Sequence, residues 1–202
     1  MNITMMKRLI DIFFSFLGLV VLAPLFVVVA ILVKIDSRGP VFFRHTRMGR
    51  EFKPFHVYKF RTMVDGAERI GASVTVGSDE RITGLGRLLR KTKIDELPQL
   101  LNVLTGEMSL VGPRPEVREY VELYAPEYRR LLSVRPGITD PASLRYAEEE
   151  GVLARSPNWE EEYRKRILPD KIKLSLEYVE NHSLVTDISL ILKTVVKAAR
   201  IG

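Results

Sequence analysis

The sequence contains no cysteine, and this absence excludes several kinds of site. Disulfide frameworks, thiolate zinc sites and cysteine nucleophiles all require that residue. Histidine is scarce as well: His45, His56 and His182 lie far apart and form neither an HxH nor an HExxH pattern. A metal site built from histidines is therefore not expected.

Common nucleotide-binding and hydrolase signatures are also missing. The chain has no GxxxxGK[ST] loop, no GxGxxG and no GxSxG. An enzyme with this sequence that acts on phosphates must hold them with side chains and a metal. Of the 202 residues, 46% are hydrophobic and 28% are charged, which excludes a disordered chain. The length predicts one domain.

The positive charge is concentrated in the first third of the chain. Residues 1–63 hold 10 Lys/Arg against 3 Asp/Glu, a net charge of +7, whereas residues 64–202 hold 21 against 22. Because the longest apolar run lies in the same third, the basic excess indicates a membrane surface. Nucleic-acid binding is the weaker hypothesis, since aromatic stacking positions are sparse.

The apolar run Ile12–Val33 has 22 residues without a charge. As a straight helix it would measure roughly 33 Å, long enough to span a bilayer core. A cleaved signal peptide fits poorly. The run is too long, Asp11 interrupts its start, and no small-x-small cleavage site follows it.

Two features argue against a simple membrane span. Pro24 lies near the middle of the run and removes a helical hydrogen bond there. Basic residues flank the run on both sides, with Lys7 and Arg8 before it and Lys34 and Arg38 after it. The positive-inside rule places both flanks in the cytoplasm. We therefore expect a re-entrant membrane helix over residues 1–36, bent at Ala23-Pro24, and a cytoplasmic domain over residues 37–202; a kinked single span is the alternative.

The remaining sequence predicts an α+β fold that is mostly helical. Val41–Thr46 and Phe52–Arg61 look like two strands and predict a small β-hairpin with a turn at Met48-Gly49-Arg50. The C-terminal third predicts two amphipathic helices, Trp159–His182 and Asp187–Arg200. One face of the last helix carries Lys193, Lys197 and Arg200. Such a helix can lie on an anionic lipid surface, and packing on its own domain is the alternative.

Asp95 and Glu96 form the first candidate site. They are expected to open a helix that ends at Gly106, where an N-cap role is the simplest interpretation. Two adjacent carboxylates can also hold Mg²⁺ while one attacks a phosphorus atom. Basic residues crowd the preceding stretch: Arg87, Arg90, Lys91 and Lys93. Carboxylates within a basic cluster, after a membrane segment, suit a phosphorylated substrate.

Arg114 is the second candidate. It stands between Pro113 and Pro115, which stiffen the backbone on both sides. A rigidly presented arginine suits bidentate binding of phosphate, and a surface turn is the alternative. Arg135–Thr139 is a similar element.

Taken in order, these motifs resemble the bacterial sugar transferases. More narrowly, they resemble the small monotopic phosphoglycosyl transferases, which begin polyprenol-linked glycan assembly. The resemblance is strong over residues 5–140 and loose beyond. The motifs are KRxxD at Lys7–Asp11, GPVFF at Gly39–Phe43, YKFRTM at Tyr58–Met63, DELPQLLNVLTGEMSLVGPRP at Asp95–Pro115 and RPGIT at Arg135–Thr139.

The resemblance implies transfer of a sugar-1-phosphate from a UDP-sugar to undecaprenyl or another polyprenyl phosphate, with release of UMP. It implies a cytoplasm-facing catalytic domain at the bacterial inner membrane. Asp95 would be the nucleophile of a covalent aspartyl-phosphosugar intermediate, and Asp95 and Glu96 would hold Mg²⁺. The cations expected to bind substrate phosphates are Lys59, Arg90, Arg114 and Arg145.

The chain departs from the family pattern at two places. After RPGIT, many relatives continue with GLAQVNGR, whereas this chain has Asp140–Tyr146, DPASLRY. At the expected helix break it has Ala23-Pro24 in place of Ser-Pro, so no hydroxyl can satisfy the freed carbonyl. A different class of function remains an alternative at this point. A non-enzymatic membrane-anchored adaptor with a basic surface would need neither the carboxylate pair nor a rigid arginine.

Overall fold

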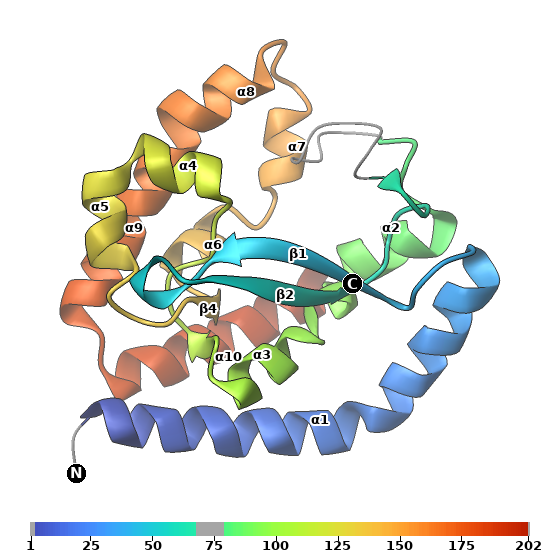
Figure 1. Cartoon of the computed structure of the whole chain (residues 1–202), viewed down its shortest axis with the longest axis horizontal. Coiled ribbons are helices and arrows are strands. Elements are labelled where there is room, and N and C mark those ends of the chain that lie inside the picture. The colour runs from blue at the N-terminus through green and yellow to red at the C-terminus, as the bar shows by residue number, and fades with distance from the viewer. Residues whose placement is uncertain (1–2, 68–78, 202) are drawn as a thin grey trace.

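The computed structural model describes residues 3–67 and 79–201, without the side chains of residues 3, 150 and 199–201. The described chain is mostly helical and contains two small two-stranded sheets, as the α+β prediction requires (Figure 1). The first sheet is the predicted hairpin. β1 (Phe42–Met48) pairs antiparallel with β2 (Pro54–Phe60), and Phe42 lies opposite Phe60. The connection over residues 49–53 is longer than the predicted turn and includes Glu51 and Phe52 with positive φ.

Two short helices and a turn follow the hairpin. α2 (Gly84–Lys91) is capped by Thr83, whose Oγ1 accepts a hydrogen bond from the Gly86 amide at 2.9 Å. The expected single helix beginning at Asp95 is wrong in its start: residues Ile94–Glu96 form a 3₁₀ turn, η3, and α3 covers Gln99–Thr105. Pro98 occupies the cap position of α3, so Asp95 is not its N-cap. The predicted C-cap is confirmed, because Gly106 has φ 93°.

The second sheet joins two of the sequence motifs. β3 (Ser109–Val111) pairs in parallel with β4 (Gly137–Thr139), a strand that the sequence analysis did not predict. The Gly112 amide donates to the Thr139 carbonyl at 3.0 Å, and the Gly137 amide donates to the Pro113 carbonyl at 3.0 Å. A Cβ on Gly137 would collide with the Gly112 backbone. The glycines of GPRP and RPGIT therefore allow the two segments to lie against each other.

The rest of the described chain is helical. Its short helices are α4 (Arg118–Leu123), α5 (Ala125–Leu131), α6 (Pro141–Arg145) and α7 (Glu149–Leu153). The predicted long helix consists of α8 (Trp159–Glu162), a π-helical segment η4 (Tyr163–Ile167) and α9 (Leu168–Asn181), and α10 (Leu184–Ile201) follows it. The largest buried cluster lies among these helices and includes Tyr120, Tyr128, Leu131, Ile167 and Leu168.

The membrane-like segment forms one helix, α1 (Ile3–Asp36), with Pro24 inside it. It is the one helix in the described ranges that is long and apolar enough to cross a membrane. The helix continues through Ala23-Pro24 and bends in its second half, so the expected break is a bend within a continuous helix (Figure 1). Its outer face is apolar and exposed: Phe13, Phe16, Val20, Val21, Val27, Val28, Ile31 and Ile35.

The N-terminal half of α1 is bound to the domain through polar groups. Ser109 Oγ donates to Asp11 Oδ2 at 2.8 Å, and the Leu110 amide donates to Asp11 Oδ1 at 3.0 Å. Arg8 donates to the Val103 carbonyl near the end of α3 at 2.6 Å. These contacts explain why charged residues precede the apolar run. They hold this half of the helix along the domain surface.

The other end of α1 is bound to the same domain. Val29 and Val33 are buried with Phe60 of β2 and Leu89 of α2. Arg61 donates to the carbonyls of Val33 at 3.2 Å and Ser37 at 2.7 Å, and also to that of Arg38, so it caps the C-terminal end of the helix. Lys34 adds a bond to the Gly39 carbonyl at 2.8 Å. Both ends of α1 thus contact one folded unit.

α10 is amphipathic, as the sequence analysis predicted, and it exposes an apolar face. Its exposed side chains are Val185, Ile188, Leu192, Val195 and Val196. Lys197, expected on an outward basic face, instead donates to the Leu144 carbonyl of its own domain at 2.6 Å. Leu190 packs inward. The side chain of Arg200 lies outside the described residues. Contact of α10 with lipid stays a prediction.

Gly137→Ala tests the close approach of the two motifs. Forcing a methyl group against the Gly112 backbone costs about 1–3 kcal/mol. For a domain of this size, that lowers the melting temperature by about 2–12 °C, measured by thermal unfolding in detergent. Gly151→Ala is the matched control, because a Cβ there meets nothing within 4 Å. Equal melting temperatures for both variants would contradict the packing argument.

Candidate active site

Three separate elements bring charged groups together around Glu96. Lys59 is near the end of β2, Glu96 closes η3, and Arg114 lies in the segment after β3. Lys59 Nζ lies 2.7 Å from Glu96 Oε1. Arg114 Nη2 lies 2.7 Å from the same oxygen, and its Nη1 lies 3.4 Å from Glu96 Oε2. One carboxylate thus binds two of the predicted phosphate ligands.

The local backbone explains how the carboxylates reach this position. α2 ends at Lys91, and Lys93 adopts a left-handed conformation with φ 57°, which is uncommon for a residue other than glycine. The chain then turns, and Ile94 packs against the buried cluster that includes Val29 and Phe60. The turn places Asp95 inward, where the residue is 6% exposed.

Asp95 has an unpaired carboxylate oxygen. Its Oδ1 is buried and has no hydrogen-bond partner. Burial and the charge of Glu96 raise the pKa of Asp95, and Lys59, Lys93 and Arg90 oppose the rise, so that the pKa is about 6. The group is therefore mostly ionised at neutral pH. An unpaired carboxylate oxygen among cations can bind a metal ion or attack phosphorus.

Glu96 differs from Asp95 although the two are adjacent. Burial would raise the pKa of Glu96, but the charges of Arg114 and Lys59 and their hydrogen bonds outweigh burial and hold it well below its ordinary value. In turn, Glu96 raises the pKa of Arg114. Glu96 therefore stays ionised and fixes the two cations. Two adjacent carboxylates with opposite pKa shifts indicate two different roles.

The sequence analysis expected the Arg114 guanidinium to bind phosphate in a bidentate manner. In the structure, this guanidinium also contacts a carboxylate of the protein. Glu96 accepts two hydrogen bonds from it. A guanidinium has five N–H donors, so donors remain for a phosphate. The side chain is 34% exposed, which leaves it accessible to a substrate.

The two remaining predicted cations have other partners. Arg90 Nε donates to Thr62 Oγ1 at 3.0 Å, and its charge lowers the pKa of Asp95, so it lies near the carboxylates. Arg145 Nε lies 3.5 Å from Asp170 Oδ2, and its guanidinium lies over the Tyr146 ring. The structure thus brings Lys59, Arg90 and Arg114 to the carboxylate pair, whereas Arg145 pairs with α9.

A second group of buried charges continues from Arg114, and the sequence analysis missed it. Glu116 Oε2 lies 3.2 Å from Arg47 Nη1, and its Oε1 accepts from the Tyr163 hydroxyl at 3.1 Å. Lys171 lies 3.7 Å from Glu116 and 2.9 Å from Glu149. The only sequence signal was a carboxylate directly after the GPRP motif.

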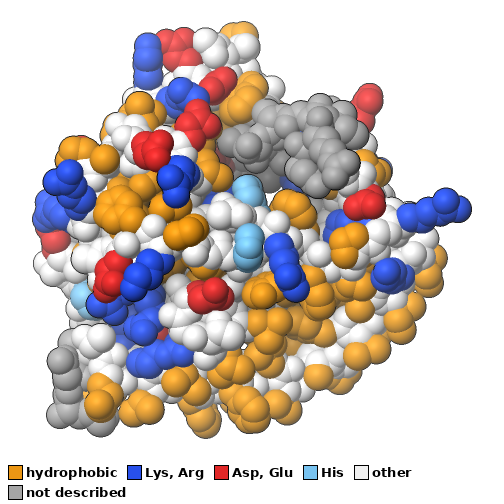
Figure 2. All heavy atoms as spheres, in the orientation of Figure 1, with side chains coloured by type: hydrophobic (Ala, Val, Ile, Leu, Met, Phe, Trp, Pro, Cys, Tyr) orange, Lys and Arg blue, Asp and Glu red, His pale blue; other side chains and the backbone are white. Residues whose placement is uncertain are grey.

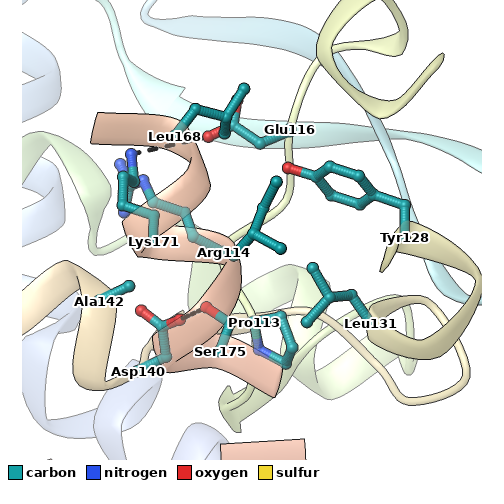
Figure 3. A pocket seen from close by; sticks show the side chains of 11 residues that line it. Pro113, Arg114, Glu116, Tyr128, Leu131, Asp140, Ala142, Leu168, Lys171 and Ser175 are labelled. Carbon is teal, nitrogen blue, oxygen red and sulfur yellow. Dashed lines mark hydrogen bonds and ion pairs between the residues drawn. The ribbon is translucent and has the colours of Figure 1, made fainter. Parts of the chain in front are cut away.

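Glu116 and Lys171 of this group, together with Arg114, line a pocket between the motif segment and α9. Figure 3 shows Arg114, Glu116 and Lys171 along its upper part and the bond between Asp140 and Ser175 at its base. Ser175 Oγ donates to Asp140 Oδ2 at 2.6 Å. The lining residues do not include Asp95 or Glu96. The pocket therefore lies on the side of Arg114 away from the carboxylate pair.

The donors available for a divalent cation are carboxylates. In the described ranges, no group of three or more His, Asp and Glu side chains gathers. The unpaired Asp95 Oδ1 fits an Mg²⁺ ligand, since this ion takes one or two carboxylates together with water and substrate phosphates. Glu96 fits less well as a direct ligand because two cations already bind it.

Comparison with known proteins identifies the family. The model of the bacterial sugar transferases matches residues 2–200. An exopolysaccharide production protein, PSS, of Rhizobium leguminosarum bv. phaseoli is 44% identical over 95% of this chain and 94% of its own length. A UDP-glucose:undecaprenyl-phosphate glucose-1-phosphate transferase of Caulobacter vibrioides is 38% identical, over 94% of this chain and 68% of its own length.

Some relatives are much longer than this chain. A UDP-N-acetylgalactosamine-undecaprenyl-phosphate N-acetylgalactosaminephosphotransferase of Aeromonas hydrophila is 38% identical over 94% of this chain, but the match spans only 42% of that protein. The match over nearly the whole sequence shows that the chain belongs to the bacterial sugar transferase family.

Proposed function

We propose that the protein transfers a sugar-1-phosphate from a UDP-sugar to undecaprenyl phosphate or a similar polyprenyl phosphate, releasing UMP. Relatives named for glucose-1-phosphate and N-acetylgalactosamine phosphate transfer to undecaprenyl phosphate support the reaction class. Because those names differ in the sugar, the proposal stops at the class of UDP-sugars. Family membership makes the chain an enzyme, so the non-enzymatic adaptor is no longer the alternative.

The unpaired oxygen of Asp95 carries the proposal. A buried carboxylate oxygen without a hydrogen-bond partner is costly to a fold, so a function is its best explanation. Glu96 next to it is fully engaged by Lys59 and Arg114. Asp95 therefore suits the nucleophile, and Glu96 suits the group that positions the cations.

The first step of the proposed reaction is attack by Asp95. Its carboxylate oxygen bonds to the phosphorus that bears the sugar, and the bond between this phosphorus and the oxygen of UMP breaks. UMP leaves with the electron pair of that bond. An anion that attacks a diphosphate needs nearby positive charge, which Lys59, Arg90 and Arg114 supply.

The second step regenerates the enzyme. An oxygen of the polyprenyl phosphate bonds to the same phosphorus, the bond to Asp95 breaks, and the carboxylate returns to its first state. One diphosphate linkage replaces another, so little net driving energy is needed. This fits a sequence without an ATP-binding loop.

Mg²⁺ is the proposed cofactor. Asp95 would hold it through its carboxylate group, together with substrate phosphates. The ion would supply charge to offset the developing negative charge on phosphate oxygens. Lys59 and Arg114, held by Glu96, remain in place whether or not the ion is bound.

We also propose that α1 is re-entrant and that the catalytic domain, residues 37–202, faces the cytoplasm at the bacterial inner membrane. Asp11 and Arg8 bind one half of α1 to the domain, and Val29, Val33 and Arg61 hold the other half. A helix that crosses the bilayer would have one end on the far side. Two ends on one domain therefore support entry into and return from a single leaflet.

Asp95→Asn is expected to reduce UMP release more than about 1,000-fold, because the amide cannot act as the nucleophile. The direct measurement is trapping: the wild type, incubated with sugar-labelled UDP-sugar and no acceptor, should carry the label, and the variant should not. Glu122→Gln is the control, since its exposed carboxylate only pairs with Arg118 on α4. Near-normal turnover by Asp95→Asn would show that Asp95 is not the nucleophile.

Arg114→Lys is expected to lower kcat/KM about 10- to 150-fold. Lysine keeps the charge but cannot bind both Glu96 oxygens and a phosphate at once. The loss corresponds to about 1.5–3 kcal/mol for one charged hydrogen bond. Arg118→Lys, at an exposed position on α4, is the control and should keep wild-type kinetics. Unchanged kinetics in both variants would contradict a role of Arg114 in phosphate binding and would favour the alternative that it is part of a turn.

The topology of α1 can be tested with single cysteines, since the native chain has none. Thr4→Cys and Asp36→Cys place a thiol near each end of the helix, at exposed positions. In intact cells, an impermeant thiol reagent should label neither, and in inverted vesicles it should label both. Labelling of Thr4→Cys in intact cells would establish a crossing helix instead.

A further inference from the structure

An aromatic pair on β1 borders the candidate active site. Successive strand residues face opposite sides, so Phe43, His45 and Arg47 share one face of the hairpin. Phe43 lies directly opposite Lys59 in the register. Side chains opposite each other in such a pair have Cβ atoms about 5 Å apart. The aromatic pair therefore lies beside the lysine that binds Glu96.

Packing alone does not explain the exposure of the Phe43 ring or its contact with His45. Phe42, on the other face, is 39% exposed and stacks on buried Phe60 with 5.3 Å between ring centroids. Phe43 is 37% exposed, and its ring contacts that of half-buried His45, with 5.9 Å between the centroids and 55° between the ring planes. Histidine side chains reach the surface over the hairpin (Figure 2). An exposed aromatic surface is thus available next to the cations.

His45 is held in a defined state. Arg47 Nη2 lies 3.4 Å from His45 Nδ1, and because arginine can only donate, Nδ1 accepts and Nε2 carries the proton. Burial and the charges of Arg47 and Lys59 lower the pKa of His45 to about 4, with Glu116 opposing them. The imidazole is therefore neutral at physiological pH. A neutral ring with one N–H donor suits an uncharged ligand group better than a phosphate.

We propose that Phe43 and His45 form the platform that binds the pyrimidine base of the nucleotide donor. The inference rests on the proposed function, because the donor is taken to be a UDP-sugar. A base offers a flat uncharged face for stacking and carbonyl oxygens for the His45 N–H. Lys59, one strand away, would bind the diphosphate of the same molecule. The platform thus orients the leaving UMP relative to Asp95.

The test compares binding of UMP with binding of ribose 5-phosphate, which has the same phosphate and no base. The full-length protein in nanodiscs is titrated with each, as wild type and as Phe43→Leu, which keeps apolar volume and loses the ring face. We expect Phe43→Leu to weaken UMP binding roughly 5- to 150-fold and to leave ribose 5-phosphate unchanged.

Two further variants make the result specific. Phe43→Tyr keeps a stacking ring and should restore UMP affinity. Phe42→Leu removes a phenylalanine of nearly equal exposure from the opposite face and should leave the ratio of the two affinities unchanged. A Phe43→Leu variant that loses both ligands equally would show a distorted phosphate site and overturn the platform. So would unchanged UMP binding with a raised KM for UDP-sugar, which would assign the ring to the sugar.

The inference and the proposed function fail in different ways. If the wild type turns over a UDP-sugar while UMP binding does not depend on Phe43, the platform is overturned and the reaction stands. If UMP binding depends on Phe43 but no UDP-sugar is turned over, the platform is supported and the reaction is overturned.

Discussion

The candidate site depends on one half-buried carboxylate that two cations share. Glu96 binds Lys59, 37 residues earlier, and Arg114, 18 residues later, each at 2.7 Å. Removing Glu96 would leave Lys59 and Arg114 close together without the carboxylate that they share, which is destabilising. The hairpin, the left-handed turn at Lys93 and the parallel pair of β3 and β4 all serve to bring these groups together. Among the described residues, Asp95 Oδ1 has no hydrogen-bond partner, while Lys59 and Arg114 both bind the neighbouring Glu96.

A second carboxylate, away from the site, also binds cations from separate elements. Glu116, two residues after Arg114, collects Arg47 from β1, Tyr163 from the π-helical segment and Lys171 from α9. The C-terminal helices, for which the family resemblance was loose, therefore contact the proline-flanked motif through buried charges. A π-helical segment is uncommon and often marks a functional position. Here it carries the tyrosine whose hydroxyl reaches Glu116.

The sequence predicted what depends on local pattern and missed what depends on long-range pairing. The hairpin follows from two strand-like segments joined by a turn. The C-cap follows from the glycine at position 106, and the apolar helix follows from a run without charges. β4 has three residues, too few for a periodic signal, and it forms only because β3 lies beside it. Asp95 and Glu96 could be named as candidates. Their different roles could not, because these depend on which carboxylate Lys59 and Arg114 reach.

The anchoring of α1 at both ends has a mechanical consequence for the surrounding lipid. A single spanning helix adjusts to bilayers of different thickness by tilting. With Arg8 and Asp11 fixed at one end and Arg61 capping the other, α1 cannot tilt independently of the domain. With the proposed re-entrant insertion, the depth of α1 in the bilayer would then be set by the protein. Lipids against its exposed valines and phenylalanines would have to adapt their own arrangement to the helix.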